Sequence, residues 1–303
     1  MRIVFAALLS ALLWIGLAAG ASAQNGLERF EKDIKPQFEL KKFSYGSAQP
    51  LGAAGFVLND VVAVVPANAA TGDKESTVRI DKVTVDALDF DRLKKDAKDD
   101  LVPRFAKLRM EGITGDDELF SALEPYGVPR VPFDVALDYR LDPDTKVLTL
   151  DMLEVALRGQ ARLALSMVLD GVSDMANAKD DARLRSASLT IDDKELFAKL
   201  IPAAAQEEGI TAEELVTTAL DALGGFAQAQ SGETLKALDA VASFVADWKA
   251  PKGPIVLGLK PAKTAGLDDL DKIMMPNGLS TFFGFTATYP GTKPGAAQAG
   301  AKK

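Results

Sequence analysis

The 303-residue chain contains no cysteine and no histidine. This absence excludes Ser-His-Asp and Cys-His nucleophile systems, zinc sites built on histidine or thiolate, and haem or iron–sulfur ligation by these side chains. The sequence also lacks the phosphate-binding patterns GxGxxG and GxxxxGK[ST], and the SxxK pattern of a serine nucleophile. We therefore expect no metal and no cofactor, and we favour a protein that is not an enzyme.

Carboxylates are the remaining candidates for catalysis, and three groups of them stand close together in the sequence: Asp89/Asp91, Asp142/Asp144 and Asp268/Asp269/Asp271. A glycosidase needs two carboxyl groups about 5–10 Å apart. Each group also has a structural explanation: the first precedes a helix, the second occupies a turn, and the third lies at a helix start, where acids favour the dipole. A carboxylate-based hydrolase is therefore the least favoured function.

The first 23 residues are typical of a secretory signal peptide. Arg2 precedes an apolar run from Ile3 to Ala19, and small residues at Ala21 and Ala23 form a cleavage site. The alternative is an uncleaved anchor, because the run approaches the roughly 17–20 residues that span a bilayer. We expect cleavage after Ala23, release into a Gram-negative periplasm, and no transmembrane segment in the mature chain.

Basic residues are few. Without Arg2, the mature chain has 34 lysines and arginines against 43 aspartates and glutamates, a net charge of −9. Because neutralisation of phosphates dominates nucleic-acid affinity, we expect no nucleic-acid partner.

Strict alternation of apolar and polar residues predicts three adjacent antiparallel strands within residues 133–172. Asp142-Pro143-Asp144-Thr145 is turn chemistry between the first two strands, and Arg158-Gly159-Gln160 separates the second from the third. At residues 78–86 the alternation slips by one residue, which usually means a β-bulge.

The apolar period becomes helical from residue 194 to residue 249. Asp193 is expected to cap the first helix, which Pro202 should kink or shorten. A Thr211–Glu214 capping box begins the second helix, and Gly224-Gly225 should end it. Ser231 is expected to cap the third helix, in which Trp248 is a core residue.

These elements predict an α+β fold: a large antiparallel β-sheet with a layer of three helices, at about residues 194–249, packed on it. We expect one domain over residues 24–290, with a sub-boundary near residues 173–181, and a disordered tail at residues 291–303 because this tail is rich in Gly, Ala, Pro and Lys.

The predicted sheet is wider than its helical cover. About ten strands at about 4.8 Å spacing give a single sheet on the order of 45–50 Å wide. Three helices at about 8–10 Å spacing cover roughly 25–30 Å. Short helices could cover the remainder, the sheet could curl on itself, or an uncovered strip could bind an apolar ligand.

We favour the last alternative, because apolar patches of this size are uncommon on soluble monomers unless they bind something. Lipid is the obvious apolar cargo of a periplasm. The candidate binding face consists of seven residues: Phe133, Val135, Leu137, Tyr139, Leu163, Leu165 and Met167. The alternatives are that these residues are ordinary core under the helices, and that the protein is an envelope scaffold or protein-interaction module without a small ligand.

The alternating strands, followed by "LRSASLTIDDKELFAKLIPAAAQEEGIT" and "WKAPKGPIVLGLKPAKTAGLDDL", resemble uncharacterised Gram-negative periplasmic proteins. More distantly, the chain is similar to the strand-rich AsmA-like envelope proteins over residues 100–290. That resemblance implies an envelope location and an association with lipid traffic, and it implies no catalytic residue. The chain departs from the AsmA-like proteins in its short length and in lacking a retained anchor.

Overall fold

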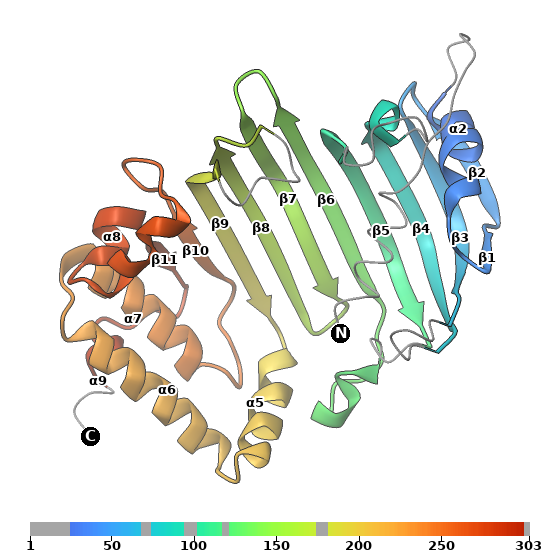
Figure 1. Cartoon of the computed structure of the whole chain (residues 1–303). Coiled ribbons are helices and arrows are strands. Elements are labelled where there is room, and N and C mark those ends of the chain that lie inside the picture. Colours follow the sequence, from blue (N-terminus) through green and yellow to red (C-terminus); the bar gives the residue numbers. More distant parts are fainter. Residues whose placement is uncertain (1–24, 68–73, 94–101, 117–120, 174–180, 300–303) are drawn as a thin grey trace. The chain divides into compact units, whose positions relative to one another are not determined.

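A computed structural model of the chain describes residues 25–67, 74–93, 102–116, 121–173 and 181–299. The predicted signal peptide and residues 174–180 of the predicted sub-boundary lie outside the described residues. The fold is α+β, as predicted: eleven strands form a large antiparallel sheet, accompanied by several helices (Figure 1). Neighbouring strands follow the order β1-β3-β4-β5-β6-β7-β8-β9-β10-β11, and β2 also pairs with β3.

The chain divides into two compact units, and the division runs through strand β7 (Val147–Leu157). Unit 1 comprises Met1–Ala122, Arg130–Leu153 and Val172–Ala178. Unit 2 comprises Leu123–Pro129, Glu154–Gly171 and Lys179–Lys303. The single domain expected over residues 24–290 stays a prediction.

Unit 1 begins with short helical turns and continues as a β-meander. Its elements are α2 (Gly26–Arg29), η1 (Phe30–Ile34), η2 (Lys35–Gln37), β1 (Lys42–Ser44), β2 (Ser47–Leu51), β3 (Gly55–Val65), β4 (Ser76–Leu88), η3 (Phe90–Leu93), β5 (Phe105–Gly115) and β6 (Phe133–Asp142). Its largest fully buried side chains include Phe30, Phe56 and Phe90, which stand on helical turns and on β3. The core of unit 1 is therefore partly aromatic.

The predicted phase slip in β4 is real, but a bulge in the β3–β4 pairing does not cause it. Asn59 pairs with Lys82 and Val61 pairs with Ile80, so the register is unbroken at Asp81. Instead Asp60 in β3 and Gly112 in β5, which lie on either side of Asp81, both have left-handed backbones, with φ of 54° and 67°.

In β3, β4 and β5 alike, the alternation of buried and exposed side chains shifts by one residue next to Asp81. A Cβ at position 112 would lie 1.9 Å from Asp81 Oδ2, so only glycine fits there. In β4, for example, Ile80 is buried before the change and Val83 is buried after it. The kink of three strands together keeps both halves of β4 in the core.

Unit 2 combines the far strands with the helices. Its elements are η4 (Glu124–Tyr126), β8 (Ala161–Asp170), β9 (Arg183–Asp193), α5 (Leu196–Glu207), α6 (Ala212–Ala227), α7 (Gly232–Ala246), β10 (Ile255–Leu259), η5 (Leu267–Met274), α8 (Gly278–Phe283), β11 (Thr286–Thr288) and α9 (Ala296–Ala299). The three predicted helices are present. The Phe197 backbone N–H donates to Asp193 Oδ1 over 3.1 Å, and the Thr211–Glu214 capping box is formed.

Four details of the prediction for unit 2 differ in the structure. Helix α5 runs through Pro202 to Glu207, so of the two expected effects of the proline, kinking or shortening, shortening does not occur. Helix α6 continues past Gly224-Gly225, because Phe226 and Ala227 pack in the cluster around Leu238. Ser231 is at the N-cap position of α7, but its side chain caps nothing; its hydroxyl accepts a hydrogen bond from Asn277 Nδ2 instead.

The fourth detail is the tail, which is ordered up to residue 299. Asp239 on α7 accepts hydrogen bonds from the backbone N–H groups of Gly295 and Ala297, at 2.7 and 3.0 Å. Ala297 is buried against Leu238 and the rest of that cluster. Small residues therefore permit close packing here, whereas their composition suggested disorder.

The helices do not form one flat layer on the sheet. Helix α7 contacts the sheet through Ala240 and Phe244, which cluster with Ile255 and Tyr289. Helix α6 packs on another side of α7, where Leu220 and Leu223 meet Leu238 (Figure 1). The helices thus pack against one another as well as against the sheet. The direct contact of α7 with the sheet is with β10 and β11.

Candidate functional site

The seven candidate residues stand on two strands. Phe133, Val135, Leu137 and Tyr139 are on β6 in unit 1, and the other three, Leu163, Leu165 and Met167, are on β8 in unit 2. The two sets are therefore separate candidates, each judged by its own surroundings.

Two of the four β6 residues are core, which corrects the prediction for them. Val135 is 2 % exposed and Tyr139 is 8 % exposed, and the Tyr139 hydroxyl donates to the carbonyl oxygen of Pro103 over 2.9 Å. Burial raises the pKa of Tyr139 to about 12. Phe133 and Leu137 are half-buried. Because Val135 and Tyr139 are enclosed in protein, this face has little area left for a ligand.

The β8 set belongs to an apolar face that extends over three strands of unit 2. Residues that pair directly across antiparallel strands point to the same side of a sheet. The register gives three such rows across β8, β9 and β10: Leu163–Ile191–Ile255, Leu165–Leu189–Leu257 and Met167–Ala187–Leu259. Every member of these rows is apolar, so one side of this part of unit 2 is continuously apolar.

Cover decreases from β10 to β8 along the first row, whereas the members of the other two rows are all half-buried. In the first row Ile255 is 2 % exposed, Ile191 is half-buried and Leu163 is 43 % exposed. The cause is the position of α7, whose Phe244 packs against Ile255 in a cluster that also takes in Ile191 and Leu257. Leu163 is therefore not a core residue, and Leu165 and Met167 are half-buried.

We call the less covered part the β8–β9 face and define it by Leu163, Leu165, Met167, Ala187 and Leu189. The two β9 members, Ala187 and Leu189, were not among the seven candidate residues. The signal was present, because Ala187, Leu189 and Ile191 alternate with serine and threonine. Only the strand register connects them to Leu165 and Met167.

The opposite face of the same strands is small and partly polar. Ser166 pairs with Ser188, which in turn pairs with Gly258, and Ala164 pairs with Thr190. No carboxylate, lysine or arginine lies among these five strand positions or on the β8–β9 face.

Ion pairs mark the ends of β8. At one end Arg162 Nη2 lies 2.5 Å from Glu154 Oε2, and this hydrogen bond raises the pKa of Arg162. At the other end Arg185 Nε donates to Asp170 Oδ2 over 3.0 Å. The mainly apolar stretch between them has seven residues, Leu163–Leu169, and spans roughly 20 Å at about 3.3 Å per residue.

The carboxylate groups have the structural roles predicted for them. Asp142 accepts from the backbone N–H groups of Asp144 and Thr145, which closes the turn. A hydrogen bond from the Thr145 side chain, together with these backbone hydrogen bonds, lowers the pKa of Asp142. Asp89 accepts from the backbone N–H of Arg104 over 3.0 Å. Asp91 pairs with Arg29 over 2.7 Å.

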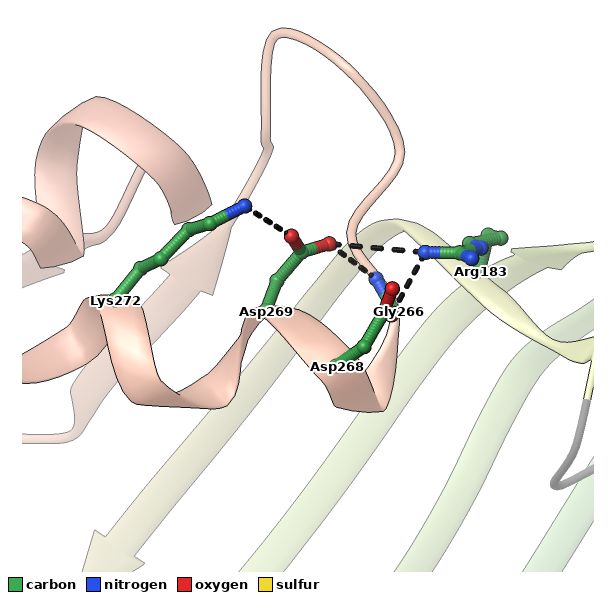
Figure 2. A network of polar contacts seen from close by, with 5 residues as sticks. All are labelled: Arg183, Gly266, Asp268, Asp269 and Lys272. Carbon is green, nitrogen blue, oxygen red and sulfur yellow. Dashed lines mark hydrogen bonds and ion pairs between the residues drawn. The ribbon is translucent and has the colours of Figure 1, made fainter.

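The third group joins η5 to the start of β9 (Figure 2). Asp269 Oδ2 accepts from the backbone N–H of Gly266 over 2.8 Å, and the other oxygen accepts from Lys272 Nζ. Arg183 reaches Asp268 over 2.9 Å. The hydrogen bond from Lys272 is the main cause of the lowered pKa of Asp269. These carboxylates are held by neighbouring cations and by a helix start.

Two observations limit the chemistry of the described residues. No group of three or more acidic side chains within them is arranged to hold a metal ion. No helix in the same part of the chain is long and apolar enough to cross a bilayer.

A protein-family model described as "Uncharacterized protein" matches residues 149–290. No curated protein matches the chain. The matched segment begins within β7 and extends through β11, so it contains the β8–β9 face together with the helices and β10.

Proposed function

We propose that the protein is an exported, non-enzymatic protein of the Gram-negative cell envelope that binds an apolar ligand, such as a lipid acyl chain, on the β8–β9 face. The observation that carries the proposal is the change in exposure from buried Ile255 to half-buried Ile191 and exposed Leu163 along one apolar row. A row that begins under a helix and ends in water offers a ligand a surface continuous with the core.

The free energy available supports a chain-like ligand. Burial of apolar surface contributes about 25 cal/mol per Å², or about 0.8 kcal/mol for each CH₂ group removed from water. The roughly 20 Å stretch of β8 between its two ion pairs allows contact with several such groups. The AsmA-like resemblance stays a prediction, and it agrees with a lipid ligand.

Export is part of this proposal, because a periplasmic location would bring the protein to lipids that must cross water. We propose that the signal peptide is removed after Ala23. Intact mass and N-terminal sequencing of the protein from the envelope of its own cell test this step. A species that keeps Met1–Ala23 would contradict it and would favour a tethered protein.

The binding proposal is tested by native mass spectrometry of the protein purified from its own periplasm, with solvent extraction to identify any bound species. We expect a lipid or other apolar molecule to co-purify. Leu165→Asp should abolish that association and leave the circular dichroism spectrum largely unchanged, because water reaches the half-buried position. Ser166→Asp is the matched control, since it adds the same charge one residue away on the opposite face.

Two outcomes would contradict the proposal. One is that no apolar species co-purifies while Leu165→Asp unfolds the protein, which would mean that the face is core. The other is that Leu165→Asp and Ser166→Asp weaken ligand binding equally, which would mean that the β8–β9 face is not the site.

An envelope scaffold is the second candidate, and a separate observation favours it. Four of the large apolar side chains that are exposed lie on η5, α8 and the link between them: Leu270, Met274, Met275 and Phe282, of which Met274 is 75 % exposed. Exposed apolar clusters mark protein interfaces as well as ligand sites. Crosslinking in the envelope, with capture lost in Met274→Asp, would support this candidate.

A further inference from the structure

One corner of unit 2 exposes several large apolar side chains within a short stretch of chain. It consists of η5, the link that follows and α8, and we define the η5–α8 corner by Leu270, Met274, Met275 and Phe282. These four are half of the eight large apolar residues that are exposed in the described part of the chain. Exposed apolar residues are therefore concentrated in this corner.

Hydrogen bonds fix the backbone on which these side chains stand. Asn277, in the link, is bound to the segment between α6 and α7. Its N–H donates to Gln230 Oε1 over 2.6 Å, its Oδ1 accepts from the Ser231 N–H over 2.7 Å, and its Nδ2 donates to Ser231 Oγ over 2.9 Å. The fold thus holds this apolar corner in water by specific contacts.

Elements η5 and α8 also pack closely on each other. A Cβ at Gly278 would lie 1.9 Å from the carbonyl oxygen of Lys272, so a side chain at the start of α8 would push the two elements apart. Lys272 Nζ stands over the ring of Phe282, 5.3 Å from its centroid. These contacts join the η5 and α8 parts of the corner.

Charge around the corner is balanced, although the net charge of the chain is −8. Residues 260–284 contain three lysines and three aspartates. Two of these aspartates are bound by cations (Figure 2). Asp268 lies 2.9 Å from Arg183, and Asp269 accepts from Lys272. The acidic excess of the chain is therefore not at this corner, and the corner can approach a surface that carries negative charge.

We propose that the η5–α8 corner inserts into the interface of a lipid bilayer, with Met274 and Met275 below the head groups. The exposed parts of its four side chains add up to about two whole side chains, an area on the order of 300 Å². A stable protein interface buries about 800 Å² on each partner, of which more than half is apolar. The corner is smaller than that, whereas a bilayer needs no matching surface and takes up apolar side chains to a depth of about 5–10 Å.

Vesicle flotation of the mature chain, from Gln24 onward, tests the proposal. The probes are vesicles of phosphatidylcholine alone and of phosphatidylcholine with phosphatidylglycerol. We expect the protein to float with both, and to do so in about 1 M salt as well, because apolar burial and not charge drives the contact. Binding that requires phosphatidylglycerol, or that is lost in salt, would contradict the proposal.

Two matched variants locate the contact. Met274→Asp should weaken vesicle binding at least about tenfold, because the new charge would have to leave water with the corner. The position is 75 % exposed, so the fold should be kept. Ile210→Asp adds the same charge at an exposed apolar residue between α5 and α6 of the same unit, and it should leave binding unchanged. Circular dichroism of both variants checks the fold.

Tryptophan at the same two positions gives a direct readout of insertion. Emission of Met274→Trp should shift to the blue when vesicles are added, because indole is favoured at the membrane interface. Emission of Ile210→Trp should not shift. The native tryptophan of the mature chain, Trp248, is buried and is common to both variants.

Three further results would overturn the proposal: no flotation with either vesicle, equal effects of Met274→Asp and Ile210→Asp, or no emission shift in Met274→Trp. If Met274→Asp abolishes capture of an envelope protein and leaves flotation unchanged, the corner binds a protein and the bilayer proposal is wrong. Leu165→Asp separates this proposal from the proposed function, because it should leave flotation unchanged. Loss of the co-purified ligand with intact flotation then concerns the β8–β9 face alone.

Discussion

Val135 in unit 1 and Leu163 in unit 2 occupy equivalent places in two regularly alternating strands, yet their environments differ. Val135 ends the paired row Leu58–Val83–Met110–Val135, in which every side chain is buried. Leu163 ends a row in which exposure rises from one strand to the next. Alternation identifies which residues share a face, and only tertiary packing decides whether that face is covered.

The largest effect is expected from one charge placed at each of these two positions. Val135→Asp would bury an unpaired carboxylate, which costs several kcal/mol and is enough to unfold a typical domain. Leu163→Asp should cost about 1 kcal/mol or less, because the side chain is already 43 % exposed. Urea denaturation followed by circular dichroism measures both changes, and equal losses of stability would break the comparison.

A smaller effect is expected from the buried phenol of unit 1 at alkaline pH. The pKa of Tyr139 is raised to about 12 from 10.0, so the folded state keeps a proton that the unfolded state loses between these values. The contribution of Tyr139 is therefore complete below pH 10 and is lost as pH rises to 12, which amounts to about 2–3 kcal/mol.

Stability curves at several pH values should show this slope in the native protein and not in Tyr139→Phe. In an ultraviolet titration of the folded protein, the last of the four tyrosines to ionise should be absent from the same variant. Burial raises the pKa of Tyr289 in unit 2 as well, so it also titrates late. Titration of all four tyrosines near pH 10 would show that the interior of unit 1 is open to water.

The helices of unit 2 also depend on local signals, and these should contribute less. Thr211→Ala removes the hydroxyl that accepts from the Glu214 backbone N–H over 3.2 Å at the start of α6. Loss of such a cap costs about 1 kcal/mol. Thr217→Ala, an exposed position inside the same helix, should be neutral or slightly stabilising, because alanine is the better helix former. Thermal unfolding followed at 222 nm distinguishes the two, and an equal loss would contradict the capping role.

The smallest effects are expected from the ion pairs along the strands of the two units. Arg140 with Asp151 in unit 1 and Arg162 with Glu154 in unit 2 are both partly exposed. Exposed pairs of this kind contribute about 0–1 kcal/mol and are screened by salt. Arg140→Gln and Arg162→Gln should each change the denaturation midpoint only slightly, and less so in 1 M salt. A large effect of Arg162→Gln alone would show that this ion pair stabilises the end of β8.

Local sequence signals predicted much of this fold because their causes are local. The Asp142–Thr145 turn, the Asp193 cap and the Thr211 capping box each depend on a side chain bonding to backbone a few residues away. The errors came from distant partners. Gly224 does not end α6, because the contact that extends the helix comes from α7.

The candidate site was predictable to the same extent. Alternation placed Leu163, Leu165 and Met167 on one face, and the structure agrees. Alternation could not distinguish these three residues from buried Val135 and Tyr139. Which part of a face is covered, as α7 covers Ile255, depends on tertiary packing. Estimating the width of the sheet against its cover predicted that some apolar surface is left over. Which strand carries that surface depended on the packing of α6 on α7 instead of on the sheet.

The kink at Asp81 has a consequence for the accuracy of strand pairing during folding. In a plainly alternating strand, a slip of two residues keeps every apolar side chain on its proper side, so hydrophobicity alone does not penalise it. Strand β4 changes phase at Asp81, between left-handed Asp60 and Gly112. After a two-residue slip these three positions no longer align, so the left-handed residues of β3 and β5 no longer flank the phase change of β4. The kink thus acts as a register mark that lets the meander of unit 1 reject its nearest wrong pairing.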